Sequence, residues 1–503
     1  MKNATGEMKK VPRGWAEATL ENSCEIIMGQ SPSSDFYNTE SNGLPFFQGK
    51  AEFAEVHPVV QKWCSSPNKI ADKDDILLSV RAPVGPTNIA NVKCCIGRGL
   101  AAIRYKLPEC HKFLFYYLRC IEKSLAGQGT GSTFSAISGS VIKNQPFPLP
   151  PLPEQHRIVA KIEELFSDLD AGIASLRKAK EQLKTYRQSV LKWAFEGKLT
   201  EEWRKKNKPE PACELLKRIK AEREKKYKEE SDKAKKEGTR APRKMEELPP
   251  ISEEELDKLS RQPDGWAWIY LKNVTEGPEY GSSAKSKKEG KIPVLRMGNI
   301  QNCFFDWSDL VFSNNPEEIR KYWLKPGDVL FNRTNSPELV GKTALYKGER
   351  DAIFAGYLIR VNQVKQIVPG YLNYFLNSGF AHEYGNKVKT DGVNQSNING
   401  EKLGKYRFPL CSETEQEEIL LEIESRLSVA DNLEKTIDAS LAQAAALRQS
   451  ILKRAFEGKL VPQDPKDEPA EKLLERIKNV RTADSRRLKD DADFKIKNKE
   501  ESE

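Results

Sequence analysis

The sequence predicts a mixed α/β (α+β) protein. Two globular domains are separated by two long helices that form an intramolecular antiparallel coiled coil with pseudo-two-fold symmetry. Residues 187–199 return as 448–460 with eleven of thirteen positions identical, at an offset of 261 residues, and a period of half the chain indicates two copies of one unit. Each copy carries a heptad stripe, which is typical of long paired helices. The rest of each copy has short apolar runs broken by Gly, Pro, Asn and Ser, which favours compact α/β domains.

The composition bounds the class of protein. The chain has 503 residues, 38% hydrophobic and 31% charged, with a net charge of +9 and a pI near 8.8. This length allows two to four domains, and the charge allows a polyanionic partner without requiring one. The nine cysteines are irregularly spaced without a CxxC motif, so we expect reduced thiols in the cytoplasm. The four histidines are scattered and no apolar run approaches the roughly 20 residues of a membrane span, so we expect neither a metal site nor a membrane helix.

Six segments are expected in order along the chain. They are a first globular domain at 12–150, a first helical region at 151–200, a charged linker at 201–262, a second globular domain at 263–411, a second helical region at 412–461, and a charged tail with a short helix at 462–503.

The two globular domains show similar local signals. Each opens on a Gly-Trp pair, then has an apolar strand after a turn and a short helix with an aromatic face. The signals lie at 14–15, 75–80 and 111–125 in the first domain, and at 265–266, 328–331 and 370–377 in the second.

The helical regions carry apolar residues in steps of four and three, which predicts a coiled coil. The second copy shows a small phase shift near its start. The seam residues are Ile158, Ile162, Leu165, Leu169, Leu176, Leu183, Val190, Ile419, Ile423, Leu433, Ile437, Leu447 and Ile451. Each helix should run about 40–45 residues, roughly 60–65 Å, and Gly197 and Gly458 lie where C-caps are expected. A heptad stripe alone also suits a structural rod, but two equal stripes in one chain favour antiparallel pairing within it.

The linker between the copies is strongly charged. Residues 217–244 carry both signs of charge and few branched apolar residues, which indicates a solvated helix or a disordered linker. A related amphipathic Leu-Leu motif lies at 214–219 and 472–477. We expect each motif to dock a short helix, either within the chain or on a partner.

Motifs for catalysis are missing, so no catalytic residue is assigned. Gly341-Lys342-Thr343 is similar to the end of a phosphate-binding loop, but Ser336 stands where that loop needs glycine. The glycine-rich stretch 126–131 follows a predicted helix rather than a strand, which favours a flexible loop over a nucleotide site. The chain also lacks the Asn/Asp-Pro-Pro-aromatic tetrapeptide of adenine methyltransferases, a Gly-x-Ser-x-Gly motif and a nuclease-like carboxylate cluster.

Polar loops after the strands suit contacts with DNA. Small hydroxyl side chains and lysine suit phosphates, Asn and Gln suit adenine edges, and Arg suits guanine or phosphate. The alternative for each residue is an ordinary polar surface loop. The candidate DNA-binding residues are Arg81, Thr130, Ser132, Thr133, Ser135, Asn332, Arg333, Thr334, Asn335, Lys342, Asn394, Gln395, Ser396 and Asn397.

These features together resemble the DNA-specificity subunit of type I restriction–modification systems, over nearly the whole chain. The resemblance rests on both Gly-Trp openings, the turn and strand 327–333, the junction Pro-Leu-Pro-Pro-Leu-Pro-Glu-Gln at 148–155, and the two Ala-Phe-Glu-Gly-Lys-Leu helix ends. The second junction, 411–416, keeps Glu-Gln but lacks the proline run.

The resemblance implies a non-catalytic subunit with two target-recognition domains, each reading one half of a bipartite asymmetric site in double-stranded DNA. It implies that the coil fixes the spacing between half-sites and docks two methylase subunits, through which restriction subunits join. The assembled complex would methylate adenine N6 and cut DNA as part of a prokaryotic defence. S-adenosylmethionine, ATP and Mg²⁺ would then belong to the partner subunits, and this chain would need no cofactor.

Two other functions remain as alternatives. One is an enzyme with its own methyltransferase or nuclease site, which would need the motifs that are missing. The other is a structural coiled-coil protein without a role on DNA. A salt titration separates the latter, because DNA affinity falls steeply with salt when several phosphates are contacted.

Overall fold

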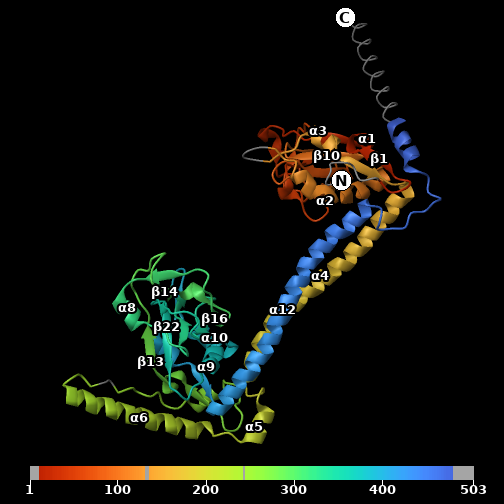
Figure 1. The fold of residues 1–503 in the computed structure, drawn as a ribbon. Coiled ribbons are helices and arrows are strands. Elements are labelled where there is room, and N and C mark those ends of the chain that lie inside the picture. Colours follow the sequence, from red (N-terminus) through yellow and green to blue (C-terminus); the bar gives the residue numbers. More distant parts are fainter. Residues whose placement is uncertain (1–10, 131–134, 242–243, 480–503) are drawn as a thin grey trace, which may run out of the picture. The chain divides into compact units, whose positions relative to one another are not determined.

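The computed structural model describes residues 11–130, 135–241 and 244–479. The chain divides into two compact units, residues 1–177 with 438–503 and residues 178–437. Each unit contains one globular domain and half of each long helix, α4 (Leu152–Phe195) and α12 (Glu413–Phe456) (Figure 1). Both helices have 44 residues, so the predicted α/β architecture with two long helices is confirmed.

The first globular domain is built on an antiparallel sheet of four strands. They lie in the order β2 (Cys24–Met28), β10 (Leu100–Tyr105), β7 (Ile76–Ser79) and β8 (Thr87–Ile89). Helix α2 (His111–Ala126) packs on this sheet. Five short strands form a second sheet in the order β3 (Tyr37–Asn38), β5 (Trp63–Cys64), β4 (Leu44–Phe47), β9 (Cys94–Ile96) and β6 (Ile70–Ala71), and β1 (Ala16–Thr19) pairs with β11 (Pro146–Leu149).

The second globular domain repeats this plan. Its antiparallel sheet has the order β13 (Thr275–Tyr280), β22 (Leu358–Gln363), β18 (Val329–Asn332) and β20 (Thr343–Leu345). Its small sheets are β17 (Val311–Ser313), β14 (Ile292–Leu295) and β21 (Ile353–Phe354), then β15 (Ile300–Gln301) with β16 (Phe304–Phe305), β19 (Thr334–Asn335) with β24 (Ser396–Asn397) and β23 (Thr390–Asp391), and β12 (Ala267–Tyr270) with β25 (Arg407–Leu410). The shorter helices of the two domains are α1 (Leu20–Ser23), α3 (Gly139–Lys143), α8 (Pro316–Lys321), α9 (Pro369–Leu376), α10 (Gly379–Val388) and α11 (Gly400–Gly404).

An Asp–Arg pair fixes the same turn in both domains. Asp75 precedes β7 and accepts two hydrogen bonds from Arg104 of β10, each 2.9 Å long. Asp328 precedes β18 and lies 3.3 Å from Nε of Arg360 of β22. Both carboxylates also cap the turn before the strand, because each accepts a backbone N–H three residues earlier at 2.8 Å. The pair therefore marks equivalent positions in the two domains, and β7 of the first domain corresponds to β18 of the second.

The charged linker is largely helical. It contains α5 (Glu201–Asn207), α6 (Ala212–Glu237) and α7 (Glu253–Leu256). Leu215 and Ile219 of the first Leu-Leu motif are buried in the core of the second unit. Leu473 and Ile477 of the second motif are buried in the core of the first unit, where residues 470–479 are helical. Both motifs therefore dock within the chain.

Helices α4 and α12 pair antiparallel in each unit, as equivalent ion pairs show. In the second unit Arg187 of α4 contacts Asp431 of α12 at 2.6 Å. In the first unit Arg448 of α12 pairs with Asp170 of α4. Arg448 is the counterpart of Arg187 and Asp170 is the counterpart of Asp431 at the offset of 261 residues. The same contact therefore occurs twice with the two helices exchanged, which is the pattern of a pseudo-two-fold coil.

The seam of α12 differs from the predicted one at two positions. Leu433 and Leu447 are each 50% exposed, so they lie beside the seam. The buried positions recur strictly every seven residues, at Ile423, Ala430, Ile437, Ala444 and Ile451. The intermediate seam positions are then filled by Glu434 and Arg448, whose charged ends pair with α4. A regular heptad thus places charged residues in line with the seam and leaves the two leucines half exposed beside it, where Leu447 lines an open groove of the coil.

The remaining predicted seam residues lie at graded depth. The fully buried ones are Ile158, Ile162, Val190, Ile419 and Ile423, while the half-buried ones are Leu165, Leu169, Leu176 and Leu183. Near the middle of α4, Gly172 is exposed and an open groove of about 540 Å³ follows the coil in the first unit. The coil is therefore packed most tightly toward the globular domain of each unit.

The end of each long helix completes the core of the domain that belongs to the other copy. Phe456 of α12 lies 5.2 Å from Phe113 and 5.3 Å from Tyr117 between ring centroids, in the first domain. Phe195 of α4 makes the equivalent contacts in the second domain, at 5.2 Å and 5.4 Å, with two rings of α9. The glycines that follow, Gly197 and Gly458, have φ values of 69° and 66°. The predicted C-caps are therefore present in both copies.

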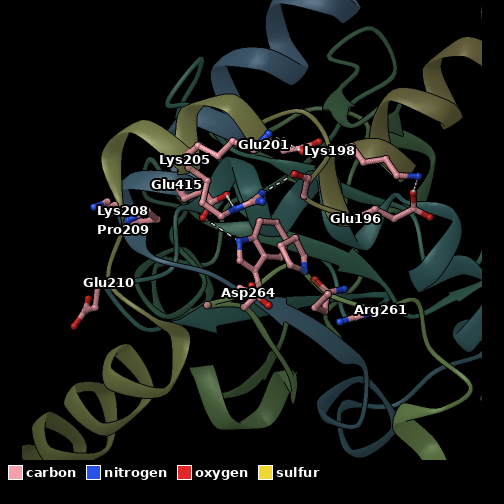
Figure 2. A pocket seen from close by; sticks show the side chains of 16 residues that line it. Glu196, Lys198, Glu201, Lys205, Lys208, Pro209, Glu210, Arg261, Asp264 and Glu415 are labelled. Carbon is pink, nitrogen blue, oxygen red and sulfur yellow. Dashed lines mark hydrogen bonds and ion pairs between the residues drawn. The ribbon is translucent and has the colours of Figure 1, made fainter.

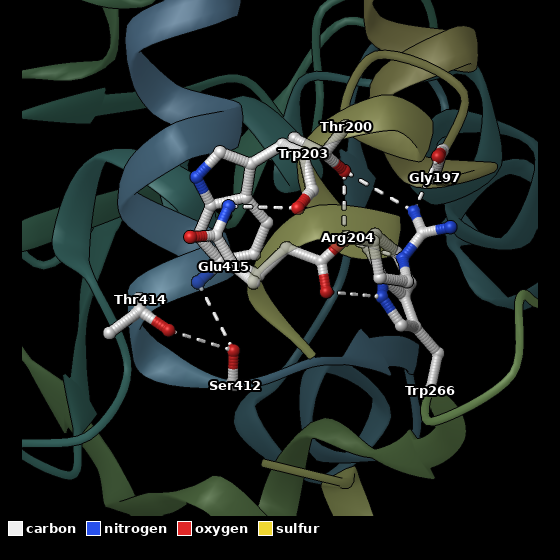
Figure 3. A network of polar contacts seen from close by, with 9 residues as sticks. Gly197, Thr200, Trp203, Arg204, Trp266, Ser412, Thr414 and Glu415 are labelled. Atoms are coloured by element: carbon white, nitrogen blue, oxygen red, sulfur yellow. Dashed lines mark hydrogen bonds and ion pairs between the residues drawn. The ribbon is translucent and has the colours of Figure 1, made fainter. Parts of the chain in front are cut away.

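A polar network locks the junction in the second unit (Figure 3). Glu415 is 1% exposed and accepts hydrogen bonds from Arg204 Nε and Thr200 Oγ1 at 2.8 Å and from Trp266 Nε1 at 2.9 Å. Arg204 also donates to the carbonyl oxygen of Gly197 at 2.5 Å. The Gly-Trp opening, the Glu-Gln helix start and the helix-end glycine of the sequence repeat therefore meet at one point.

An open cleft of about 670 Å³ lies beside this network (Figure 2). Its lining mixes acidic groups such as Glu201 and Glu210 with basic groups such as Lys205 and Lys208. Lys205 pairs with Glu201 at 3.0 Å, so part of this charge is already neutralised within α5. The cleft is thus the solvated rim of a structural junction.

The first unit keeps the close approach of glycine and proline at the junction but has a different arrangement of charges and polar contacts. A Cβ on Gly458 would lie 2.4 Å from Pro12, just as one on Gly197 would lie 2.4 Å from Pro263. Glu154, the counterpart of Glu415, is 1% exposed, and burial raises the pKa of its carboxyl. Here the guanidinium of Arg157, one turn further along α4, binds Asp467 at 2.6 Å. In the first unit the arginine at the junction is therefore on the long helix α4. In the second unit it is on α5, the short helix that follows α4.

All nine cysteines are unpaired, in line with the expectation of free thiols. None of the helices in the described part of the chain is both long enough and apolar enough to span a membrane.

Replacing Phe456 with Ala should destabilise the first unit by about 3–5 kcal/mol, because it leaves a cavity among buried rings. Hydrogen–deuterium exchange of α2, which supplies Phe113 and Tyr117, should become faster. Lys453→Ala is the matched control, since Lys453 is exposed one turn earlier on the same helix. Unchanged exchange in α2 for Phe456→Ala would contradict the proposed core closure.

Replacing Arg204 with Met should destabilise the second unit by about 3–5 kcal/mol, because it leaves the carboxylate of Glu415 buried without its cation. Adding Glu415→Gln should recover much of this loss, since no charge then remains buried. A double-mutant cycle on thermal unfolding measures the coupling. Strictly additive effects would mean that the two side chains do not act as a pair.

Candidate nucleic-acid interface

A small three-stranded sheet carries most of the candidate residues of the second domain. Its strands lie in the order β19, β24, β23. Asn397 donates to Thr334 Oγ1 at 2.8 Å, and Ser396 donates to Asp391, so the side chains tie the strands together. The tip of the β23–β24 hairpin, 392–395, is exposed, and Val393 is 100% exposed. The sheet thus holds an exposed polar hairpin on the side of the domain where β18 ends.

Arg333 lies between this sheet and the main sheet. Its backbone N–H donates to the carbonyl of Tyr357 at 3.0 Å, and its carbonyl accepts from Ile398 N at 2.9 Å. Its guanidinium lies 4.8 Å from the ring centroid of Tyr280. Within the described residues, its buried Nε has no hydrogen-bond partner. Arg333 is therefore a positioned cation with unused donor capacity.

Two lysines, Lys389 and Lys402, add positive charge beside the hairpin, and Lys342 lies near His382 of α10. Lys389 donates to the carbonyl of Pro337 at 2.9 Å, and Lys402 donates to Thr390 Oγ1 at 2.6 Å. Lys342 lies close enough to His382 that its charge adds to the effect of burial, which is the larger cause, in lowering the pKa of this imidazole. His382 is thus neutral near pH 7. The hydrogen bonds of Lys389 and Lys402 are with neutral oxygen atoms, so among the described residues neither ammonium group is held in a hydrogen-bonded ion pair, and both suit contacts with phosphates.

The structure divides the candidate residues of the second domain by accessibility. Asn332 and Ser396 are 0% exposed, so they differ from the prediction that they contact DNA. All four residues of β18, which ends at Asn332, are buried, and in β24 the side chain of Ser396 turns inward while that of Asn397 is half-buried. The accessible candidates are the exposed residues Asn394 and Gln395 and the half-buried residues Arg333, Thr334, Asn335, Lys342 and Asn397.

The first domain has the same backbone frame at this place. Ala136 forms bridges with both Arg81 and Thr130, and Ile137 N donates to the carbonyl of Val80 at 3.0 Å. This bond matches the one between Ile398 and Arg333 in the second domain. Arg81 and Thr130 are exposed and Ser135 is half-buried. Ser132 and Thr133, also predicted as contacts, lie outside the described residues.

Sequence reasoning missed four residues on this face of the second domain. Tyr280 and Tyr357 flank Arg333, being 40% and 49% exposed, and Lys389 and Lys402 flank the hairpin. The lysines on either side of the predicted loop were a usable signal in the sequence. Tyr280 ends β13 and Tyr357 lies in the turn before β22, so only the fold brings them to Arg333.

The chemistry of this face is that of binding. It offers a guanidinium, ammonium groups, amides and hydroxyls, which suit phosphates and base edges. No group of three or more His, Cys, Asp or Glu side chains suited to a metal ion occurs among the described residues.

Comparison with known proteins places the chain in a family. The family model for the type I restriction modification DNA specificity domain matches residues 12–185 and 263–443, more than half of the chain. The putative type I restriction enzyme MjaX specificity subunit of Methanocaldococcus jannaschii is 40% identical over 196 residues, which cover 38% of this chain and 45% of that protein. The type I restriction enzyme EcoKI specificity subunit of Escherichia coli is 26% identical over 506 residues, covering 94% and 97%.

Among solved structures, the HsdS subunit from Thermoanaerobacter tengcongensis is 48% identical with a TM-score of 0.30. The match covers 32% of this chain and 40% of that one. The chain thus spans less than half the length of the archaeal relative and of this HsdS subunit. The family match, by contrast, includes both globular domains and most of both long helices. The chain therefore belongs to the family of type I restriction–modification DNA-specificity proteins.

Proposed function

We propose that the chain is the non-catalytic DNA-specificity subunit of a type I restriction–modification complex. Each globular domain acts as a target-recognition domain and reads one half of a bipartite, asymmetric site in double-stranded DNA. The observation that carries this proposal is one scaffold used twice with different side chains at the polar face. Val80 in the first domain occupies the backbone position of Arg333 in the second, but Val80 is 2% exposed, and the exposed side chain of the first domain here is that of the next residue, Arg81. Two domains that share a backbone fold but differ in their exposed side chains suit the recognition of two different half-sites.

The coil sets the distance between the half-sites in this proposal. Each long helix has 44 residues, or about 66 Å at 1.5 Å per residue. Half-sites on one face of DNA recur about every 34 Å, so a coil of this length is sufficient. The equivalent ion pairs of Arg187 and Arg448 support a fixed register between the helices.

Catalysis belongs to partner subunits in this proposal. Two methylase subunits dock on the helical regions, and restriction subunits join through them, directing adenine N6 methylation and DNA cleavage. S-adenosylmethionine, ATP and Mg²⁺ are then held by those partners. The binding chemistry of the polar face, with its guanidinium, ammonium and amide donors, supports this division of labour. A cytoplasmic location follows from the substrate, which is the cell's own and incoming DNA.

Methylome sequencing tests the proposal directly. The chain and its methylase subunit are expressed together in cells that lack other adenine methylases. We expect methylated adenine in a single gapped motif with two unlike halves. Omitting this chain is the control and should abolish the motif. Methylation without a gapped motif, or methylation that persists in the control, would reject the function.

Replacing residues 12–146 with the equivalent segment of a relative should change one half of the motif and leave the other half and the gap unchanged. The reason is that each domain closes its own sheets and core within its own unit. The motif is again determined by methylome sequencing. A change in both halves would rule out modular reading.

Replacing Ile437 with Lys should destabilise the coil and relax the gap length, because Ile437 is 8% exposed in the seam and a buried lysine is costly. Leu433→Lys is the matched control one turn earlier, since Leu433 is 50% exposed. Thermal unfolding and the distribution of gap lengths among methylated sites are measured. Equal behaviour of the two variants would argue against the coil as the spacing element.

A further inference from the structure

Arg333 differs from the other partly buried arginines of the second domain. Arg296 binds Asp309 at 3.0 Å, Arg360 binds Asp328 at 3.3 Å, and Arg407 binds Glu255 at 3.0 Å. Each of these guanidinium groups is neutralised by a carboxylate and serves the fold. Arg333 makes no such ion pair with any described residue, and its only charge-related contact there is with the ring of Tyr280. Its charge is therefore left for a ligand.

The side chain of Arg333 is held in place from several directions. Tyr280 stacks against the guanidinium, and the Tyr280 hydroxyl accepts a hydrogen bond from Gly400 N at 2.9 Å. A Cβ on Gly400 would lie 3.0 Å from that hydroxyl oxygen, so the ring is closely bounded by α11. The backbone of Arg333 is fixed by the hydrogen bonds to Tyr357 and Ile398. Much of the ordering cost of binding is thus met before DNA arrives.

This arrangement separates two roles on the same face. Lysines such as Lys389 and Lys402 are point charges on flexible stems, which suits phosphates. A planar guanidinium held against a ring offers its two terminal nitrogens as a fork, which matches O6 and N7 of guanine in the major groove. The neighbouring β23–β24 hairpin has an exposed polar tip at 392–395, which can offer further contacts to base edges in that groove.

We propose that Arg333, held by Tyr280, reads one guanine in the half-site bound by the second domain. This inference rests on the proposed function and deepens it, because it assigns a base to one side chain. Tyr280 is a positioning residue that limits the orientations of the guanidinium. Arg333 thereby contributes sequence discrimination, whereas the lysines contribute affinity for any sequence.

The test uses the full-length chain assembled with its methylase subunit and duplexes containing the motif found by methylome sequencing. Each guanine of the second half-site is replaced in turn by 7-deazaguanine, which lacks the N7 acceptor. For the unsubstituted protein we expect one position at which affinity falls by about 10- to 100-fold. For Arg333→Ala the same position should make no further difference, while all other positions behave as before.

Three variants separate the possible roles. Arg333→Lys keeps the charge but loses the fork, so it should lose the discrimination at that guanine and keep most of the affinity. Tyr280→Phe keeps the ring and should retain discrimination, whereas Tyr280→Ala should weaken it. Lys389→Ala is the matched control for a phosphate contact. Lys389→Ala should weaken binding to all sequences alike. It should also lower the slope of log affinity against log salt concentration by about one.

The outcomes are distinguishable from failure of the proposed function. If the wild-type complex recognises a gapped motif but Arg333→Ala behaves like Lys389→Ala, Arg333 contacts a phosphate and the inference is overturned. The inference also fails if Arg333→Ala and wild-type protein respond alike to every 7-deazaguanine. Absence of any gapped motif would instead reject the proposed function itself. Thermal unfolding of Arg333→Lys checks that the domain is folded in the decisive variant.

Discussion

The insertion of each helix end into the domain of the other copy is the contact on which the whole architecture depends. Phe195 and Phe456 pack against aromatic rings at equivalent positions of the two domain cores. The segments that follow them add further buried residues to the same cores. Neither copy therefore buries its own domain core without the other. Because large buried rings dominate core stability, the duplication acts as a folding constraint: the two halves must pair antiparallel before either domain is complete.

Different interactions hold the two copies together along the coil and at the junctions. Along the coil, equivalent ion pairs of Arg187 and Arg448 fix the register between helices that are otherwise packed through small residues such as Ala430 and Ala444. At the junctions, a buried carboxylate meets the tryptophan that opens the domain. The second unit adds Arg204 to that carboxylate, whereas the first does not. The two junctions are therefore held by different ion pairs, Arg204 with Glu415 in the second unit and Arg157 with Asp467 in the first.

Much of the fold could be predicted from the repeat and the heptads, because both are local and periodic. The errors were also local: Leu433 and Leu447 were chosen for their apolar character, whereas the regular heptad places Glu434 and Arg448 in line with the seam. Accessibility at the polar face was harder to predict. Asn332 is the last residue of the fully buried strand β18, and a polar side chain there looks like a contact in the sequence although it faces the interior. Tyr280 could not be assigned at all, since its role depends on a strand far away in the chain.

The two recognition faces show how one frame supports different readings. The Asp–Arg pairs fix the turn before β7 and β18, and from that turn onward the backbone hydrogen bonds correspond between the two domains. A change of side chain at a fixed backbone position then alters what is offered to a ligand without altering the sheet that presents it. At the position of Arg333 the first domain has Val80, which is 2% exposed and packs in the core, so the neighbouring residue Arg81 is the one exposed there. Because the buried frame holds the fold, exposed positions beside it, such as Arg81 in the first domain, can vary at low cost to stability, and this separation is what allows two different recognition surfaces to be built from one repeated unit.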